Sequence, residues 1–208
     1  MTRSLVLVVV ALCLVGVPAF AQSSINIGAQ GGVNFGNADI TPDLSTTTRT
    51  GFMVGAVVEF EITEMFSIQP EVLYVQKGAK FEMNVSSMDV KATFKFDYIE
   101  IPVLFKATFG SSGFRPFVFA GPNVGFNMVS ELEGEIMGQT ATQDMSEDTE
   151  SIDFALDFGG GGEFALNEST TLFGSVRYSL GLTDIIKAED ATAKSNGIQV
   201  MVGIKWGL

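Results

Sequence analysis

The sequence predicts an all-β fold, an eight-stranded antiparallel up-and-down transmembrane β-barrel. Apolar side chains recur on alternate residues in seven of eight candidate strands, connections alternate between long and short, and aromatic residues gather near the short ones. Successive side chains of a strand point to opposite faces, so this alternation makes one face of the sheet apolar. The last candidate strand shows the pattern, with one face formed by Ile198, Val200, Val202, Ile204 and Trp206.

Eight segments are predicted as strands from this period of two. They cover residues 25–36, 51–62, 66–76, 94–109, 114–128, 151–165, 171–183 and 197–206. The fifth segment does not sort cleanly into two faces. Its Phe117 and Phe119 share a face with Arg115, while Val118 and Ala120 lie on the other. The sequence alone therefore leaves the orientation of this strand open.

The connections distinguish the two ends of the barrel. The short ones are residues 63–65, 110–113 and 166–170. The longer ones are residues 37–50, 77–93, 129–150 and 184–196. Outer-membrane barrels have short periplasmic turns and long outer loops. An even number of strands places both termini at the short-turn end, as a periplasmic location requires.

The first residues are predicted to be a secretory signal peptide. Arg3 precedes an apolar run over residues 5–17, and Ala19-Phe20-Ala21 forms a small-x-small cleavage site. The predicted division is therefore a cleaved signal at residues 1–21 and one barrel domain at residues 22–208. This predicts a multi-pass protein in the outer membrane of a Gram-negative-type bacterium.

Two alternatives for this segment are weaker. A membrane-anchoring helix is disfavoured because the apolar run is short and Pro18 interrupts it. A lipoprotein would need Cys13 as the lipidated residue, but Leu12 precedes it where a small residue is expected.

Composition excludes several classes of function. Residues 22–208 contain no cysteine and no histidine, so Ser-His-Asp and Cys-His catalytic arrangements are impossible. Without Arg3 the net charge is −13, which does not suit nucleic acid. No phosphate loop, dinucleotide fingerprint or zinc spacing occurs. We therefore predict no enzyme, no cofactor and no metal; a lipid-modifying enzyme or protease built on Ser or Asp is a third class that no feature motivates.

Alternation alone does not say which face points outward. A secreted soluble lipocalin-like barrel binding a small apolar ligand also alternates, with its apolar face inward. Charged residues make up 17% of the chain, below the roughly 25% of soluble domains, which favours the membrane. Aromatic residues beside the short turns also favour it, because they predict an interfacial girdle. Its predicted members are Phe60, Phe66, Phe109, Phe114, Phe164, Phe173 and Trp206.

Four prolines weigh against the barrel, because proline cannot donate to a strand ladder and a closed barrel has no free edge. They are Pro70, Pro102, Pro116 and Pro122. We expect them at bulges, at a rim, or where strands extend beyond the membrane.

The segment Tyr98-Ile-Glu100-Ile-Pro102-Val-Leu104-Phe-Lys106 resembles the Y-x-E-I-P-x-L-x-K signature of the PorT-like outer-membrane β-barrel family. Further matches lie at residues 117–125, 157–159, 177–185 and 203–206, so the resemblance covers nearly all of residues 22–208. It implies an integral eight-stranded outer-membrane barrel and little about activity. One departure is that Gly207 and Leu208 follow Trp206, whereas such chains often end on an aromatic residue read by the insertion machinery.

The polar faces carry charges that should pair if those faces point inward. The predicted interior network is Glu71, Glu100, Lys106, Arg177 and Lys205. One interpretation is a proton or ion pathway, or carboxylates for acid–base chemistry. The favoured one is a salt-bridged filling of a narrow barrel.

Residues 131–150 hold seven acidic residues and no basic one. Divalent cations could bind there, but the order of a calcium loop is lacking, so a solvated, partly disordered loop is the favoured interpretation.

Together these features predict a structural or interaction role in envelope integrity, anchoring, or a surface or secretion assembly. A conducting pore is disfavoured, because open channels need about 16 strands. The expected partners are outer-membrane lipid and lipopolysaccharide, the insertion machinery, and envelope proteins that contact the long outer loops.

Overall fold

The structure, a computed structural model, describes residues 24–41, 47–85, 88–110, 113–136, 139–187 and 192–208. The predicted signal peptide at residues 1–21 lies outside these ranges. The strands are β1 (Ile25–Thr41), β2 (Thr47–Glu61), β3 (Phe66–Val85), β4 (Met88–Thr108), β5 (Phe114–Ile136), β6 (Gln139–Asp144), β7 (Ile152–Ala165), β8 (Thr170–Gly181) and β9 (Thr192–Gly207). Within the described residues, no helix is long and apolar enough to cross a membrane.

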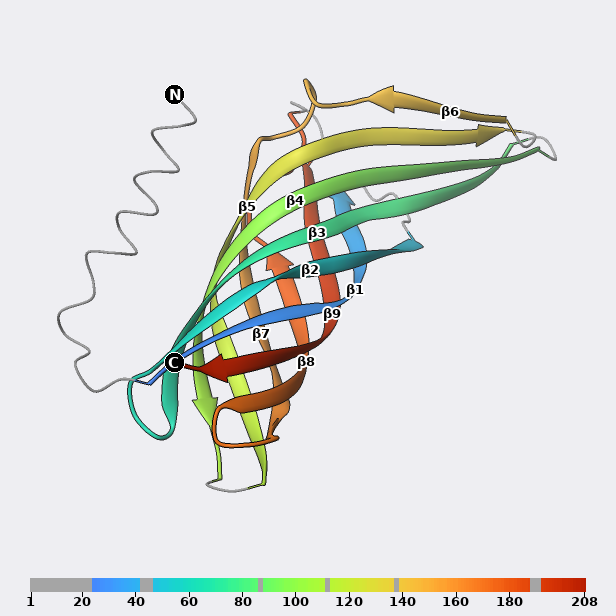
Figure 1. The fold of residues 1–208 in the computed structure, drawn as a ribbon. Coiled ribbons are helices and arrows are strands. Elements are labelled where there is room, and N and C mark those ends of the chain that lie inside the picture. The colour runs from blue at the N-terminus through green and yellow to red at the C-terminus, as the bar shows by residue number, and fades with distance from the viewer. Residues whose placement is uncertain (1–23, 42–46, 86–87, 111–112, 137–138, 188–191) are drawn as a thin grey trace.

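Eight of these strands close into a ring. The order is β4-β3-β2-β1-β9-β8-β7-β5, and β4 pairs with β5 to complete the circle. Neighbouring strands of the ring are antiparallel. The short β6 pairs with β5 and stands outside the ring. Figure 1 shows the chain end at the rim that carries the β2–β3, β4–β5 and β7–β8 turns. The predicted eight-stranded antiparallel up-and-down barrel is confirmed.

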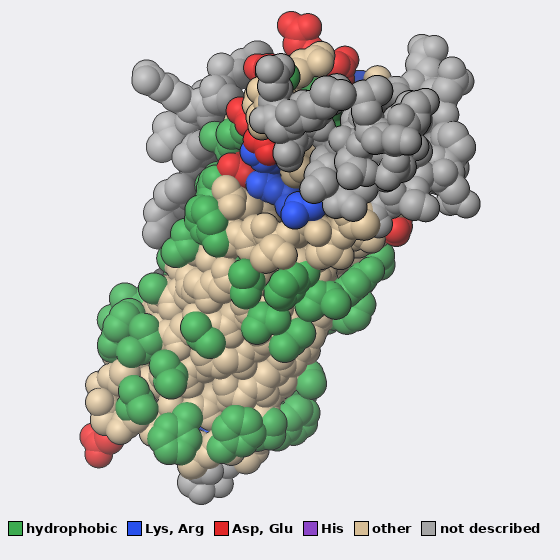
Figure 2. All heavy atoms as spheres, turned by 90° about the vertical axis from the view of Figure 1, so that its right-hand side faces the viewer, with side chains coloured by type: hydrophobic (Ala, Val, Ile, Leu, Met, Phe, Trp, Pro, Cys, Tyr) green, Lys and Arg blue, Asp and Glu red, His purple; other side chains and the backbone are tan. Residues whose placement is uncertain are grey.

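The apolar face of the ring points outward. Val202, Phe105 and Phe114 are each more than 60% exposed, whereas Arg177 on the other face is 1% exposed. Hydrophobic side chains accordingly spread over the lower part of the molecule in Figure 2, and charged ones gather toward its ends. A soluble barrel would need the opposite arrangement, so the lipocalin-like alternative is wrong.

The height of this apolar surface fits a membrane. On β2 it runs from Phe52 to Phe60, nine residues. At about 3.3 Å per residue and a tilt of about 40°, nine residues rise about 23 Å, close to the roughly 25 Å band of outer-membrane barrels.

Strands β3, β4 and β5 continue well beyond this band. Their outer parts, residues 78–85, 88–97 and 129–136, form with β6 a curved sheet that we call the outer extension (Figure 1). The predictions of long loops at residues 77–93 and 129–150 are therefore wrong, because the described residues of both segments form strands over most of their length. Pairing is continuous from Gln76–Asp97 to Val85–Met88, and β6 folds back along β5.

Polarity inverts where the strands leave the apolar band. On the outward side of β4, Ile99 and Phe105 give way to Asp97 and to Lys95, which pairs with Glu133 at 2.5 Å. On the inward side, charged residues give way to apolar ones: Ala79, Phe81 and Phe96 are all at most 5% exposed. A bulge between Asp97 and Tyr98 keeps the faces of β4 and β5 in phase through this change. The alternation thus persists in the outer extension, but the polar face now points outward and the apolar face inward. This exchange explains why the sequence of these segments resembles that of polar loops.

The structure settles the orientation of β5. Phe117 and Phe119 are buried inside the barrel on the same side as Arg115, while Val118 points outward. The prolines fit in different ways. The strand pairing is interrupted beside Pro70 and Pro102, as expected, and Pro116 lies near the rim. Pro122 also lies at an interruption, because the β4–β5 pairing skips Gly121 and Pro122, although its pairing with β7 is continuous.

An arginine at Val202, in the middle of the outward face of β9, should be strongly destabilising. A cation at this depth costs about 2–4 kcal/mol in an outer-membrane barrel. We expect Val202→Arg to lower the free energy of unfolding by this amount in urea titrations in lipid vesicles. Thr48→Arg, on the exposed part of β2 beyond the apolar band, is the matched control and should change it little.

Candidate functional site: the charged barrel interior

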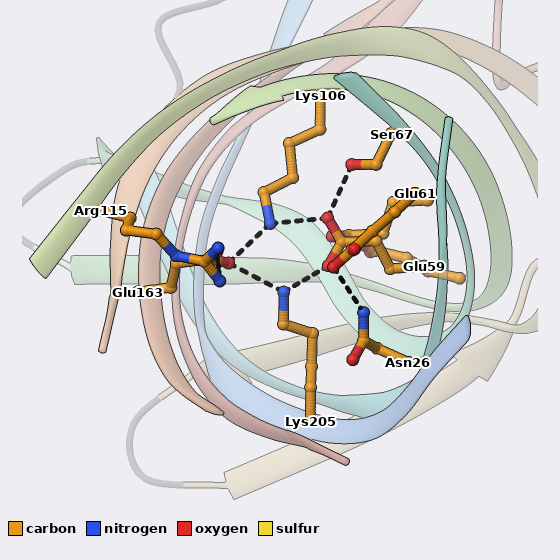
Figure 3. Close-up of polar contacts among 10 residues, drawn as sticks. Asn26, Glu59, Glu61, Ser67, Lys106, Arg115, Glu163 and Lys205 are labelled. Carbon is orange, nitrogen blue, oxygen red and sulfur yellow. Dashed lines mark hydrogen bonds and ion pairs between the residues drawn. The ribbon is translucent and has the colours of Figure 1, made fainter. Parts of the chain in front are cut away.

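The interior nearest the short turns holds a closed ring of ion pairs, the basal cluster, formed by Glu59, Lys106, Glu163 and Lys205 (Figure 3). Lys106 Nζ lies 2.9 Å from Glu59 Oε1 and 2.8 Å from Glu163 Oε2. Lys205 Nζ lies 2.8 Å from the same Glu163 oxygen and also contacts Glu59. Cations and carboxylates alternate around the ring, so each charge has two opposite neighbours. Strands β2, β4, β7 and β9 supply one member each, which ties opposite walls of the barrel together.

Further groups attach the basal cluster to the rim. Arg115 Nη2 lies 2.6 Å from Glu163 Oε1, and Ser67 donates a hydrogen bond of 2.6 Å to Glu59. Below the cluster a cavity of about 340 Å³, lined by Glu61, Thr63 and other rim residues, opens at the short-turn end. The four members of the ring are at most 4% exposed at their side chains, whereas Arg115 is 29% exposed.

A second group, the middle cluster, centres on Arg177 of β8. Its Nη2 lies 2.7 Å from Glu71 Oε2 and its Nη1 lies 3.3 Å from Asp157 Oδ2. Asn123 donates hydrogen bonds of 3.1 Å to both Asp157 and Glu100. The arginine is 1% exposed, so this cluster is fully desolvated.

A third group, the upper cluster, surrounds Lys77 of β3. Its Nζ lies 2.5 Å from Glu100 Oε1 and 3.7 Å from Asp153 Oδ2. Thr183 donates a hydrogen bond of 2.8 Å to Asp153. Because Glu100 also accepts from Asn123, it links the upper cluster to the middle one.

An aromatic ring lies against each of the four cations that belong to these three clusters. Lys106 lies 4.4 Å from the centroid of Phe117, Arg177 lies 5.3 Å from Phe119, and Lys205 lies 5.5 Å from Phe173. Lys77 lies 5.2 Å from the ring of Tyr98. These distances are those of cation–π contacts. Apolar residues, including Val57, Leu104, Met53 and Leu73, pack between the charged clusters, so side chains fill the barrel.

Glycines opposite these rings make the room that they occupy. A Cβ at Gly203 would meet the Phe173 ring at 2.4 Å, and one at Gly161 would meet the Phe117 ring at 2.7 Å. The glycine run of β7 therefore accommodates the interior aromatics of β5. No set of three or more Cys, His, Asp or Glu side chains that could hold a metal is found in the described part of the chain.

The family model described as outer membrane protein beta-barrel domain matches residues 20–187. The chain belongs to this outer-membrane β-barrel family. Its location is therefore the outer membrane, and its filled ring of eight strands makes it a small barrel with a structural or interaction role, not a large pore.

Three solved structures illustrate what this chain is similar to. Neisserial surface protein A has a TM-score of 0.53 and 12% identity, over 88% of this chain and 96% of that one. The N-terminal barrel domain of Pseudomonas aeruginosa OprF has a TM-score of 0.45 and 14% identity, over 90% and 100%. Ail of Yersinia pestis has a TM-score of 0.41 and 13% identity, over 88% and 98%. No curated protein sequence matches the chain significantly.

The five charged residues singled out from the sequence all lie inside the barrel, and each is at most 4% exposed. They do not form one network. Lys106 and Lys205 belong to the basal cluster, where Glu59 and Glu163 are their partners. The structure adds Lys77, which the sequence interpretation placed in a loop. Lys77 continues the series Glu71, Leu73 and Val75, in which every second residue of the strand faces inward. This spacing is the signal that identifies Lys77 as inward-facing.

Most of the predicted girdle lies on the lipid-facing side of this outer-membrane barrel. Five of its members are 42% to 65% exposed: Phe66, Phe109, Phe114, Phe164 and Trp206. Phe60 also points outward and is half-buried. Phe173 is a correction, because it is 7% exposed and lies inside against Lys205. Its neighbour Leu172 has the outward position. Proximity to a turn therefore predicts that a residue lies at the rim, but it does not predict whether its side chain points to lipid or into the barrel.

Proposed function

We propose that this barrel is a rigid, non-enzymatic platform that holds the outer extension above the membrane for contact with other envelope components. The candidate partners are lipopolysaccharide, outer-membrane lipid and envelope proteins, and the insertion machinery acts during assembly. The role would be anchoring, envelope integrity, or membership of a surface or secretion assembly. We also infer that residues 1–21 are removed on export and that residues 22–208 are the mature domain.

The observation that carries this proposal is that the charged side chains of the three interior clusters form ion pairs with one another. Each of the four buried cations lies between carboxylates and an aromatic ring, as described above. Buried ion pairs of this kind fix a structure, because breaking one leaves an uncompensated charge. A filled and cross-tied barrel is suited to bearing an extension, and the chemistry exposed to partners then lies on the outer surface.

The segment that resembles the PorT-like signature supports the same interpretation, and with it our inference that the chain lies in that branch of the family. Five of the six signature residues of β4 face inward, namely Tyr98, Glu100, Pro102, Leu104 and Lys106, and the sixth, Ile101, faces outward. Glu100 and Lys106 pair in the upper and basal clusters, and Tyr98 lies against Lys77. The pattern therefore describes how one strand fills the barrel, which is a requirement of structure.

Trimming the outer extension tests the proposal. Lys80 pairs with Thr93 and Glu131 pairs with Asp144, so residues 81–92 and 132–143 can each be replaced by a two-residue Asn-Gly turn. We expect the trimmed barrel to insert and to keep its heat-modifiable migration on denaturing gels. Cells that carry it should nevertheless show the envelope permeability of a strain lacking the whole protein.

The control replaces the periplasmic turn residues 63–65 with the same Asn-Gly turn, which should leave permeability at the level of the intact protein. If the trimmed barrel restores permeability as fully as the intact one, the outer extension is not the functional surface and the proposal fails.

A further inference from the structure

The inward side of the outer extension lines an apolar cavity of about 370 Å³ above the upper cluster. Phe81, Phe94 and Phe96 line it on one side and Met145, Ile185 and Ile186 on the other. The two sides meet at a packed cluster that includes Phe96 and Ile185. The cavity lies above the apolar band, on the outer side of the membrane. Pockets of this size with apolar lining at the mouth of a barrel are characteristic of small-molecule sites.

The aromatic wall is a continuous packed surface. The rings of Phe81 and Phe94 meet edge to face with centroids 5.4 Å apart, and those of Phe94 and Phe96 stack at 6.3 Å. Phe81 and Phe96 are each 5% exposed. Their positions are fixed by the paired strands β3 and β4, so the wall does not depend on a ligand to form it.

The facing wall is also fixed, by backbone hydrogen bonds between two connections. Thr149 and Ile186 form an antiparallel bridge, and Lys187 N donates to Asp148 O at 2.9 Å. Glu150 N donates to Ile185 O at 3.0 Å, which secures the same contact from the other side. The β6–β7 connection and the segment after β8 are thus held together across the top of the barrel, and the space between the walls is preformed.

The charges at the cavity define the kind of molecule that fits. Asp148 lines it, Glu147 and Glu150 are exposed in the same connection, and Asp144 is exposed at the end of β6. The one basic lining residue among those described, Lys187, donates to the Glu147 carbonyl oxygen at 3.2 Å. Four carboxylates thus lie at or beside this side of the cavity against the one lining lysine, which disfavours anionic amphiphiles there and favours cations. Aromatic faces favour the same choice, because they bind aromatic rings and cationic groups.

We propose that the outer end of the barrel is a binding site for a small apolar aromatic molecule that is neutral or cationic. Its ring system would pack on Phe94 and Phe96, and a cationic group would lie toward Asp148. The site is separate from the platform role proposed above and does not depend on it.

Two probes with one skeleton test this site: neutral N-phenyl-1-naphthylamine and its anionic relative 1-anilinonaphthalene-8-sulfonate. The protein is placed in lipid nanodiscs with ¹³C-labelled Met and Ile methyl groups, and each probe is titrated by NMR. We expect saturable shifts at Met145, Ile185 and Ile186 with the neutral probe, and binding at least about tenfold weaker with the anionic one. Ile204, which faces lipid, reports partition into the membrane. Shifts confined to Ile204, or equal affinities for the two probes, overturn the proposal.

Two variants identify the cavity as the site. Ala193→Phe fills it, because Ala193 lines it and is 2% exposed, and should weaken binding at least about tenfold. Ala56→Phe on the lipid-facing side is the matched control and should not. Asp148→Asn tests the charge at nearly constant side-chain volume, and the contact of Asp148 to Lys187 is kept because it uses the backbone. It should bring the anionic probe to within a few-fold of the neutral one, and an unchanged ratio overturns the charge argument.

Discussion

Replacing Arg177 with alanine should remove about 3–5 kcal/mol from the free energy of unfolding, the cost of breaking a buried ion pair from one side. The substitution leaves Glu71 and Asp157 without their cation in a site where the arginine is 1% exposed. Asp157 would retain its hydrogen bond from Asn123, which offsets little of the lost charge. The same change removes a group that packs on the ring of Phe119.

The measurement is urea unfolding of the refolded barrel in lipid vesicles, followed by the loss of heat-modifiable migration. Arg115→Ala is the matched control, because Arg115 also pairs with a carboxylate but is 29% exposed at its side chain. Removing Arg115 leaves Glu163 paired with Lys106 and Lys205, so the control should lose much less stability than Arg177→Ala. An Arg177→Ala barrel with an unchanged urea midpoint would show that the middle cluster does not stabilise the fold.

A further variant separates charge from packing at this site. Arg177→Met combined with Glu71→Gln and Asp157→Asn removes the cation and both carboxylates while keeping similar volumes. If the uncompensated charges cause the loss, this triple variant should be more stable than Arg177→Ala. If lost packing causes it, the two should be alike.

The sequence predicts the ring and its two faces because both follow from a period of two, which a single strand already displays. β5 escaped this logic, because both of its faces carry apolar side chains. Phe117 and Phe119 are interior residues that lie against cations, and glycines on β7 give them room. That relation joins residues far apart in the sequence, so the pattern of one strand does not reveal it.

The extent of the strands was underestimated for a different physical reason. The outward face stops being apolar where the strands leave the membrane, and the sequence pattern therefore predicts a loop that begins at Lys77. In the structure the strands continue and the solvent changes, from hydrocarbon to water outside the barrel, so the polar face moves from the inside to the outside. Where the polar and apolar faces of a strand are exchanged, the strand crosses the membrane boundary. The strand itself ends only where the period of two residues is lost.

The membership of the ion clusters was also beyond the sequence. Lys106 could have paired with any inward carboxylate, and which one it meets depends on the stagger of neighbouring strands. The register places Lys106 opposite Ser67 on one side and Phe119 on the other, and its partners Glu59 and Glu163 come from β2 and β7, each two strands away in the ring. Inward direction is a local property, whereas pairing is a property of the closed ring.

Glu163→Gln should be comparably damaging, because this one carboxylate serves three cations. Lys106 and Lys205 each lie 2.8 Å from Oε2, and Arg115 lies 2.6 Å from Oε1. The amide preserves shape but leaves Glu59 as the one carboxylate between two buried lysines. We expect a loss of about 3–5 kcal/mol in urea unfolding, again the cost of a buried charge without its partner.

The neutral variant Glu64→Gln in the exposed β2–β3 turn is the control for loss of a carboxylate as such, and should change stability by less than about 0.5 kcal/mol. The decisive comparison is the double variant Glu163→Gln with Lys106→Met, which restores the balance of one carboxylate and one buried lysine. It should recover part of the loss, so the two substitutions should be strongly non-additive. Additive losses would mean that the basal cluster stabilises the barrel through packing, and that its alternating charges are incidental.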